Sequence, residues 1–283
     1  MSLKKLLKKS MSSSSISKLS TINTKILIHM NDVWASYDGK NYSLKEITLS
    51  IERGTNYAIV GQSGSGKSTL LKLINGMMNP SKGQIKVDYQ TPNMNKKQFR
   101  REMSKIGYIP QSLGLVKNIS VLENVLIGAL PRIGTLNSLL KNFPEHEIEE
   151  AKKIIKLVGL NGKENRKTYM LSGGEKRRVA IARALMQKPI LLLADEIVSE
   201  LDQVTAREIM DLVADAQKRL NLTAVMVHHD MQLALEYANR VAVIKEGQKI
   251  LEIGIDGDKI IDFQSGNMPQ QEIMEIYNND KTN

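Results

Sequence analysis

The stretch GQSGSGKSTL, residues 61–70, decides the fold of this chain. It follows a short apolar run at residues 57–60 and precedes a segment whose apolar residues have helical spacing. Glycines let a backbone turn so that successive N–H groups point inward at an anion, and a following helix presents its positive dipole end to the same anion. A flexible linker would also be rich in glycine and serine, but a linker does not need a strand before it and a helix after it.

The spacing Gly61-x-x-x-x-Gly66-Lys67-Ser68 fits the phosphate-binding loop pattern. We expect Lys67 to reach the β- and γ-phosphates of a nucleoside triphosphate and the Ser68 hydroxyl to hold Mg²⁺. The residues predicted to bind the nucleotide here are Gly61, Gln62, Ser63, Gly64, Ser65, Gly66, Lys67, Ser68 and Thr69.

A metal-binding carboxylate follows a second apolar run, PILLLADE at residues 189–196. Such a run suits a strand that is buried on both faces. A carboxylate at the carboxyl end of a strand in an open α/β sheet points into the ligand crevice. We therefore expect Asp195 to support Mg²⁺ and Glu196 to orient or deprotonate the attacking water. The alternative, that these acids only cap the next helix, accounts for one of them but not for both.

A second glycine turn, LSGGE at residues 171–175, makes another anion-binding nest at a helix N-terminus. A single nucleotide site needs only one such nest from its own chain. A second nest on the same chain is explained if the two nests meet across a dimer. The pattern therefore predicts that each nucleotide is shared by two copies of the chain.

The chain has 283 residues, of which 41% are hydrophobic, so it can bury the core of one large α/β domain. Strand-like and helix-like segments alternate after residue 25, which indicates a largely parallel sheet. The block at about 112–170 is rich in helix and is predicted to be an inserted helical subdomain. We place the main domain at 26–255 and a short C-terminal extension at 256–283, to which no role is assigned.

The formal net charge is +10, and six lysines with no acidic residue lie before Asp32. Residues 1–25 are interpreted as a solvated basic leader, with a short amphipathic helix on an anionic membrane as the less favoured alternative. Aromatic residues make up only 4% of the chain, which argues against nucleic acid as a partner. The chain has no cysteine, which excludes disulfides, thiolate zinc sites and a cysteine nucleophile.

From residue 26 to about 255 the sequence resembles the ATP-binding subunits of ABC transporters. GQSGSGKST resembles the Walker A loop, LLLADE the Walker B strand and LSGGE the signature of that family. The resemblance implies an α/β P-loop NTPase fold. Its parts would be a RecA-like core with a mostly parallel sheet, an antiparallel N-terminal β subdomain and the inserted helical subdomain.

The resemblance also assigns roles outside these three motifs. Gln111 matches the Q-loop glutamine, which touches Mg²⁺ or the lytic water. His229 matches the switch histidine at the γ-phosphate, and it is preferred to the adjacent His228 because it directly precedes an aspartate. Tyr37 lies where the family stacks an aromatic ring on adenine. SELD at residues 199–202 resembles the D-loop, which lies at the dimer interface and contains Asp202. The signature residues expected at the partner's nucleotide are Leu171, Ser172, Gly173, Gly174 and Glu175.

The chain departs from the family after the catalytic glutamate. Ile197 and Val198 stand where a proline and a threonine or serine are usual, which frees the backbone there and puts the placement of the D-loop in doubt. The departure removes no chemical group, so both ATP sites of a homodimer are expected to be competent.

The resemblance implies an ATPase that uses ATP and Mg²⁺ as cofactors. It implies that the ATPase forms a homodimer, and that this homodimer binds integral-membrane permease subunits at the cytoplasmic face of the membrane. An extracytoplasmic solute-binding protein is a further expected partner. No apolar run is long enough to span a bilayer, so transport requires such a permease. The spacers, residues 128–147 among them, look most like those of the phosphonate-importer ATPases.

Three alternatives stay open at this point. One is an ABC ATPase of an export or lipoprotein-release system. Another is a soluble ABC ATPase that acts on nucleic acid or ribosomes, against which the single cassette weighs. The third is a small-molecule kinase with a phosphate loop, against which LSGGE weighs.

Overall fold

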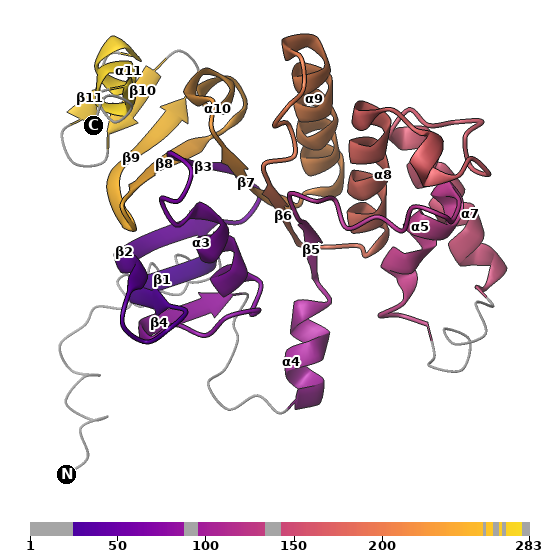
Figure 1. Ribbon diagram of the computed structural model, residues 1–283, viewed down its shortest axis with the longest axis horizontal. Coiled ribbons are helices and arrows are strands. Elements are labelled where there is room, and N and C mark those ends of the chain that lie inside the picture. Colours follow the sequence, from indigo (N-terminus) through magenta and orange to yellow (C-terminus); the bar gives the residue numbers. More distant parts are fainter. Residues whose placement is uncertain are drawn as a thin grey trace, which may run out of the picture.

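Four parallel strands form one end of the larger sheet. They are β3 (Asn56–Val60), β7 (Thr223–His228), β6 (Leu191–Asp195) and β5 (Ile106–Ile109), adjacent in that order. Every residue of β3, β6 and β7 is buried, as expected for apolar strands that are covered on both faces. The computed structural model describes residues 25–87, 96–133, 143–256, 259–262, 266–267 and 270–278 (Figure 1).

The sheet continues beyond β3 with one more parallel strand and then reverses. β8 (Arg240–Lys245) pairs with β3 in parallel, and β9 (Gln248–Asp256), β10 (Lys259–Asp262) and β11 (Gly266–Asn267) follow as antiparallel neighbours. The predicted hairpin is confirmed as the pair β8 and β9. The sequence predicted no strands after it.

A smaller antiparallel sheet contains β2 (Tyr42–Glu52), β1 (Ile26–Ser36) and β4 (Lys82–Val87). Helix α3 (Lys67–Ile74) begins directly after the glycine loop. Its buried leucines share one apolar cluster with both sheets, which fixes the helix relative to β3. The expected antiparallel N-terminal sheet beside a mostly parallel core is thus confirmed.

A helical layer is inserted between β5 and β6, as the sequence predicted. The elements α5 (Val121–Leu126), η1 (Ile127–Ala129), α7 (Glu145–Leu157) and α8 (Gly173–Met186) pack on one another (Figure 1), with η2 (Thr168–Met170) leading into α8. The remaining helices are α4 (Lys96–Met103), α9 (Gln203–Leu220), α10 (Met231–Tyr237) and α11 (Gln270–Asn278). The sequence reading predicted neither α4 nor α11.

The basic leader expected at residues 1–25 lies, except for Lys25, outside the described residues. In the part of the chain that the structure describes, no helix combines the length and the apolar character needed to cross a bilayer.

Asn124 joins the loop after β5 to the segment that leads into α8. Its side chain is fully buried. The amide oxygen accepts a hydrogen bond from the Val116 N–H at 2.9 Å, and the amide nitrogen donates to the Val116 carbonyl at 3.0 Å and to Thr168 Oγ1 at 2.7 Å. The nitrogen also lies 3.0 Å from the carbonyl oxygen of Ser120. One side chain thus satisfies polar groups from three parts of the helical layer.

Replacement Asn124→Ala is expected to lower the free energy of unfolding by about 2–4 kcal/mol, because it leaves several buried polar groups without partners. Chemical denaturation of the purified chain measures this change. The matched control is Asn118→Ala, at an exposed position of the same loop, which we expect to change stability by less than about 0.5 kcal/mol. Equal effects of the two substitutions would contradict the assigned role of Asn124.

Candidate nucleotide site

The loop between β3 and α3 is closely confined by neighbouring backbone. A Cβ atom on Gly61 would lie 2.2 Å from the carbonyl oxygen of Ile244, and one on Gly66 would lie 2.6 Å from that of Ser43. Gly66 also has φ = 105°, a conformation that side chains disfavour. The predicted need for glycine at both positions therefore has a steric basis. The backbone of β2 and β8 confines the loop at residues 61–69, which we call the phosphate cradle.

Lys67 lies folded back over this loop. Its ammonium donates hydrogen bonds to the carbonyl oxygens of Gly61 at 2.8 Å and Gln62 at 2.6 Å. Burial lowers the pKa of the Lys67 ammonium, although the charges of Glu196 and Asp195 act in the opposite direction. Within the described part of the chain the buried Ser65 hydroxyl has no hydrogen-bond partner. A phosphate oxygen would accept bonds from both groups.

Ser68 and Asp195 meet as the sequence predicted for a metal site. The Ser68 hydroxyl donates to Asp195 Oδ1 at 3.1 Å. Burial raises the pKa of the Asp195 carboxyl, as does the charge of Glu196, whereas the bond from Ser68 lowers it. No cluster of three or more His, Asp or Glu ligands occurs among the described residues. A hydroxyl and one carboxylate nevertheless fit Mg²⁺, which usually takes few protein ligands and completes its shell with phosphate oxygens and water.

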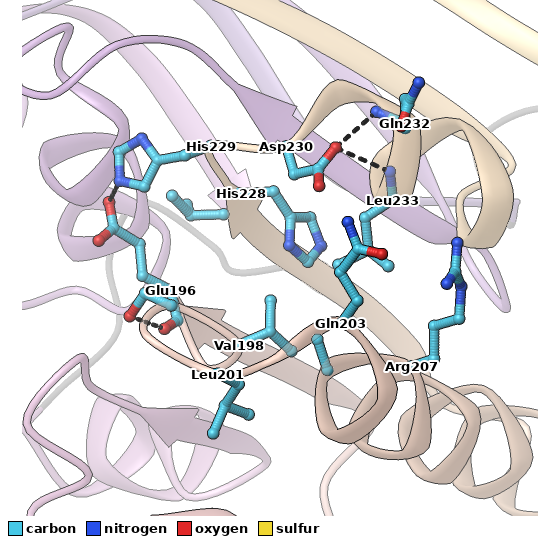
Figure 2. Close-up of a pocket in the computed structure, with 13 residues that line it drawn as sticks. Glu196, Val198, Leu201, Gln203, Arg207, His228, His229, Asp230, Gln232 and Leu233 are labelled. Atoms are coloured by element: carbon cyan, nitrogen blue, oxygen red, sulfur yellow. Dashed lines mark hydrogen bonds and ion pairs between the residues drawn. The ribbon is translucent and has the colours of Figure 1, made fainter.

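Glu196 is held between two polar side chains that come from other strands. The amide nitrogen of Gln111, in the loop after β5, donates to Glu196 Oε2 at 2.9 Å. The imidazole Nε2 of His229, just after β7, forms an ion-pair contact with Glu196 Oε1 (Figure 2). The other ring nitrogen of His229 lies 3.2 Å from the carbonyl oxygen of Gly61. Three of the four predicted catalytic side chains thus form one chain of contacts that ends on the phosphate-binding loop, where the fourth, Lys67, lies.

The two adjacent histidines point in different directions, as their positions on an extended segment require. His229 faces Glu196, whereas His228 faces a cavity of about 150 Å³ between the D-loop, α9 and α10 (Figure 2). The ring of His228 is buried, both of its nitrogens lack partners within the described residues, and burial lowers its pKa to about 4. His228 is therefore a neutral packing residue at neutral pH, and His229 is the one that reaches Glu196.

Arg177 is a functional candidate that the sequence reading missed. From the second turn of α8 its guanidinium donates to the carbonyl oxygen of Ile197 at 2.6 Å and to that of Ser199. The Ile197 side chain is buried in the helical cluster. These contacts hold the backbone at residues 197–199, where the proline that is usual in the family is missing.

The D-loop residue Asp202 caps α9 by accepting a hydrogen bond from the Thr205 N–H at 2.9 Å.

The second glycine turn begins α8, as predicted. Ser172 and Glu175 form a reciprocal capping box, with Ser172 Oγ 3.2 Å from the Glu175 N–H. Glu175 also forms an ion pair with Lys163. The side chain of Leu171 is buried in the helical cluster, so this residue packs rather than presents a side chain. Among the described residues, no hydrogen bond or ion pair joins 171–175 to 61–69, so one chain does not bring its two nests together.

Tyr37 lies beside the start of α3 with 62% of its surface exposed. Its hydroxyl is 3.1 Å from Thr69 Oγ1 and accepts a hydrogen bond from the Lys72 ammonium at 3.2 Å. The Lys72 ammonium also lies over the Tyr37 ring, 5.3 Å from its centroid, and the exposed part of the ring remains available to stack on a planar base.

Comparisons with known proteins agree with this geometry. The family model described as "ABC transporter" matches residues 44–199. A phosphonates import ATP-binding protein of Haloarcula marismortui is 35% identical over 223 residues, which cover 78% of this chain and 82% of the relative. A methionine import ATP-binding protein of Enterococcus faecalis is 38% identical over 259 residues, which cover 89% of this chain and 69% of the relative.

A solved structure leads to the same class. It is the dimeric post-hydrolysis state of the cassette MJ0796 bound to ADP and phosphate, which superimposes with a TM-score of 0.71 at 30% identity. The match covers 82% of this chain and all of the other. The chain belongs to the ABC transporter ATP-binding family. It is an ATP-binding cassette, an enzyme whose hydrolysis of ATP is coupled to transport.

The substitution Lys67→Ala is expected to lower the affinity for ATP by about 100-fold or more, because it removes charge-assisted bonds to phosphate from a buried position. Titration with a fluorescent ATP analogue measures the loss. Lys218→Ala, at an exposed position of α9, is the charge-matched control and should bind like the wild type. Undiminished binding by Lys67→Ala would refute the cradle.

Proposed function

We propose that the chain energises an importer, with two copies closing on two ATP molecules. The observation that carries this proposal is the contact chain from Gln111 through Glu196 to His229, which ends at the loop containing Gly61 and Lys67. An acid held between two orienting groups beside a phosphate cradle suits the transfer of a phosphoryl group to water better than nucleotide storage.

The cradle would bind the triphosphate by exchanging partners. The Lys67 ammonium would leave the carbonyl oxygens of Gly61 and Gln62 for β- and γ-phosphate oxygens, and the Ser65 hydroxyl would gain the partner that it lacks. Ser68 and Asp195 would hold Mg²⁺, which when bound supplies positive charge at the phosphate oxygens.

Glu196 would take the proton of the attacking water. Its two carboxylate oxygens are directed by Gln111 and His229, so the carboxylate has little freedom to turn away from the water. In the nucleotide-bound state these two side chains would exchange part of this contact for the water and the γ-phosphate.

A second copy would complete each site with its own nest at the start of α8. Among the described residues this nest forms hydrogen bonds and an ion pair with the preceding segment and with α8 itself, and no hydrogen bond joins it to the phosphate loop. Its glycine N–H groups would therefore meet the γ-phosphate of the partner copy. Because Arg177 joins α8 to the backbone after Glu196, nest and D-loop would move together.

The membrane partners follow from the family. We propose that permease subunits bind the homodimer at the cytoplasmic face of the membrane, and that an extracytoplasmic binding protein delivers the solute. ATP binding would stabilise the closed dimer and hydrolysis would reopen it, so the permease would sense a shift in population.

For the solute we propose a phosphonate or a related phosphorus oxyanion. Relatives named as phosphonate-import proteins support this substrate, in agreement with the resemblance of the spacers. A second candidate is methionine, because the relative named for methionine import matches a longer part of this chain.

The substitution Glu196→Gln is expected to reduce ATP hydrolysis by about 100-fold or more while ATP still binds, because the amide keeps the shape of the acid and loses its basicity. The variant should then accumulate as a dimer in ATP and Mg²⁺, which light scattering after size exclusion measures. The double variant Lys67→Ala and Glu196→Gln is the control and should stay monomeric. A monomeric Glu196→Gln variant with bound ATP would contradict the shared site.

Deletion of the gene in its source organism should abolish growth on a phosphonate as sole phosphorus source, and the wild-type gene but not the Lys67→Ala gene should restore it. Uptake of labelled methionine is measured in the same strains. Loss of methionine uptake with normal phosphonate growth would overturn the phosphonate assignment in favour of the second candidate.

A further inference from the structure

The C-terminal helix α11 packs behind the segment that carries His229. Ile273 and Tyr277 are one helical turn apart, and both are buried, with exposures of 0% and 3%. They belong to an apolar cluster with β3, β8, β9 and α10. The members of that cluster are Ala58, Val60, Met231, Ala234, Ala238, Val241, Val243, Leu251, Ile253, Ile273 and Tyr277. Helix α11 is therefore part of the folded core.

The Tyr277 hydroxyl donates a hydrogen bond to the main-chain carbonyl oxygen of His229 at 2.5 Å, across 48 residues of sequence. The neighbouring residues of this segment are fixed in other ways. His228 ends β7 in register with Val60, and Asp230 caps α10 by accepting bonds from the N–H groups of Gln232 at 2.8 Å and Leu233 at 3.2 Å. Tyr277 thus adds a hydrogen bond from a distant element to His229, which lies between the end of β7 and the capping residue of α10.

The position of His229 is constrained because both nitrogens of its ring contact other residues. Its Nε2 pairs with Glu196, and its Nδ1 lies 3.2 Å from the carbonyl oxygen of Gly61. A shift of the His229 main chain would carry its Cα and Cβ atoms with it and break one contact or both. Misplacement of a reacting group by about 1 Å can cost a large factor in rate.

We propose that Tyr277 is a positioning residue for ATP hydrolysis. Its hydroxyl anchors the main chain of His229 and thereby the position from which the imidazole reaches Glu196. This proposal rests on the proposed role of His229 at the γ-phosphate. It gives residues 270–278 a task that their apolar packing alone does not explain, since a phenylalanine ring would fill the same space.

The test is Tyr277→Phe in the full chain, because this change keeps the buried ring and removes only the hydroxyl. We expect kcat for ATP hydrolysis to fall by about three- to tenfold, the factor that one ordinary hydrogen bond is worth. KM for ATP should stay close to the wild-type value, because the cradle does not change. The melting temperature should fall by no more than a few degrees, the effect expected from the loss of one hydrogen bond.

The chain offers a matched control in Tyr237→Phe. Tyr237 is the last residue of α10. Its hydroxyl donates to Asp211 Oδ1 at 2.8 Å and lies 3.5 Å from the carbonyl oxygen of Arg207, so the same substitution removes a tyrosine hydroxyl from the same region without touching His229. We expect kcat of this variant to stay within about twofold of the wild type, since the contacts that it loses involve neither His229 nor Glu196. An equal fall of kcat in both variants would overturn the proposal.

A His229→Ala variant separates this proposal from the one on which it rests. A large loss of kcat in His229→Ala together with the selective loss in Tyr277→Phe supports both. A large loss in His229→Ala with wild-type kcat in Tyr277→Phe overturns the role of Tyr277 and leaves that of His229 intact. Wild-type kcat in His229→Ala overturns the role of His229, and the proposal for Tyr277 falls with it.

Discussion

The parallel register of four strands is the constraint on which the site depends. Val60 is paired with His228, Asp195 with Val227, and Ile109 with Ala194, so the carboxyl ends of β3, β7, β6 and β5 lie at one edge of the sheet. The residues that follow these ends are the glycine loop, His229, Glu196 and Gln111. A slip of one residue in any ladder would turn a catalytic side chain to the opposite face.

The backbone around Glu196 carries strain that the surroundings offset. Glu196 has φ = 52°, a left-handed conformation that costs about 1–2 kcal/mol for a residue with a Cβ. The Ser199 hydroxyl donates to the Glu196 carbonyl at 2.8 Å, Arg177 binds the next carbonyls, and the Ile197 side chain is buried. These contacts replace the rigidity that a proline would supply, so the family's usual residue is not needed for a defined turn at this position.

Local patterns in the sequence predicted most of the fold and the cradle. A glycine loop between strand and helix, or an acid after a dry strand, has a meaning that a short window contains. Arg177 and Tyr277 could not be found in this way, because each acts on a backbone carbonyl 20 or 48 residues away. A short window also fails for α4, because its sequence KKQFRREM contains only two apolar residues. The sequence predicted that the two nests meet across a dimer, and this meeting stays a prediction because the structure contains one chain.

The resting position of Lys67 has a consequence for how nucleotides are discriminated. The ammonium already sits among protein carbonyls and out of bulk water, so most of its dehydration is incurred when the chain folds and not when a ligand arrives. Those two carbonyl oxygens also compete with any incoming group. An anion that presents a single weakly charged oxygen gains little by displacing them, whereas adjacent phosphates offer enough negative charge to do so. The loop thus sets a threshold of ligand charge, below which the lysine remains bound to its own backbone.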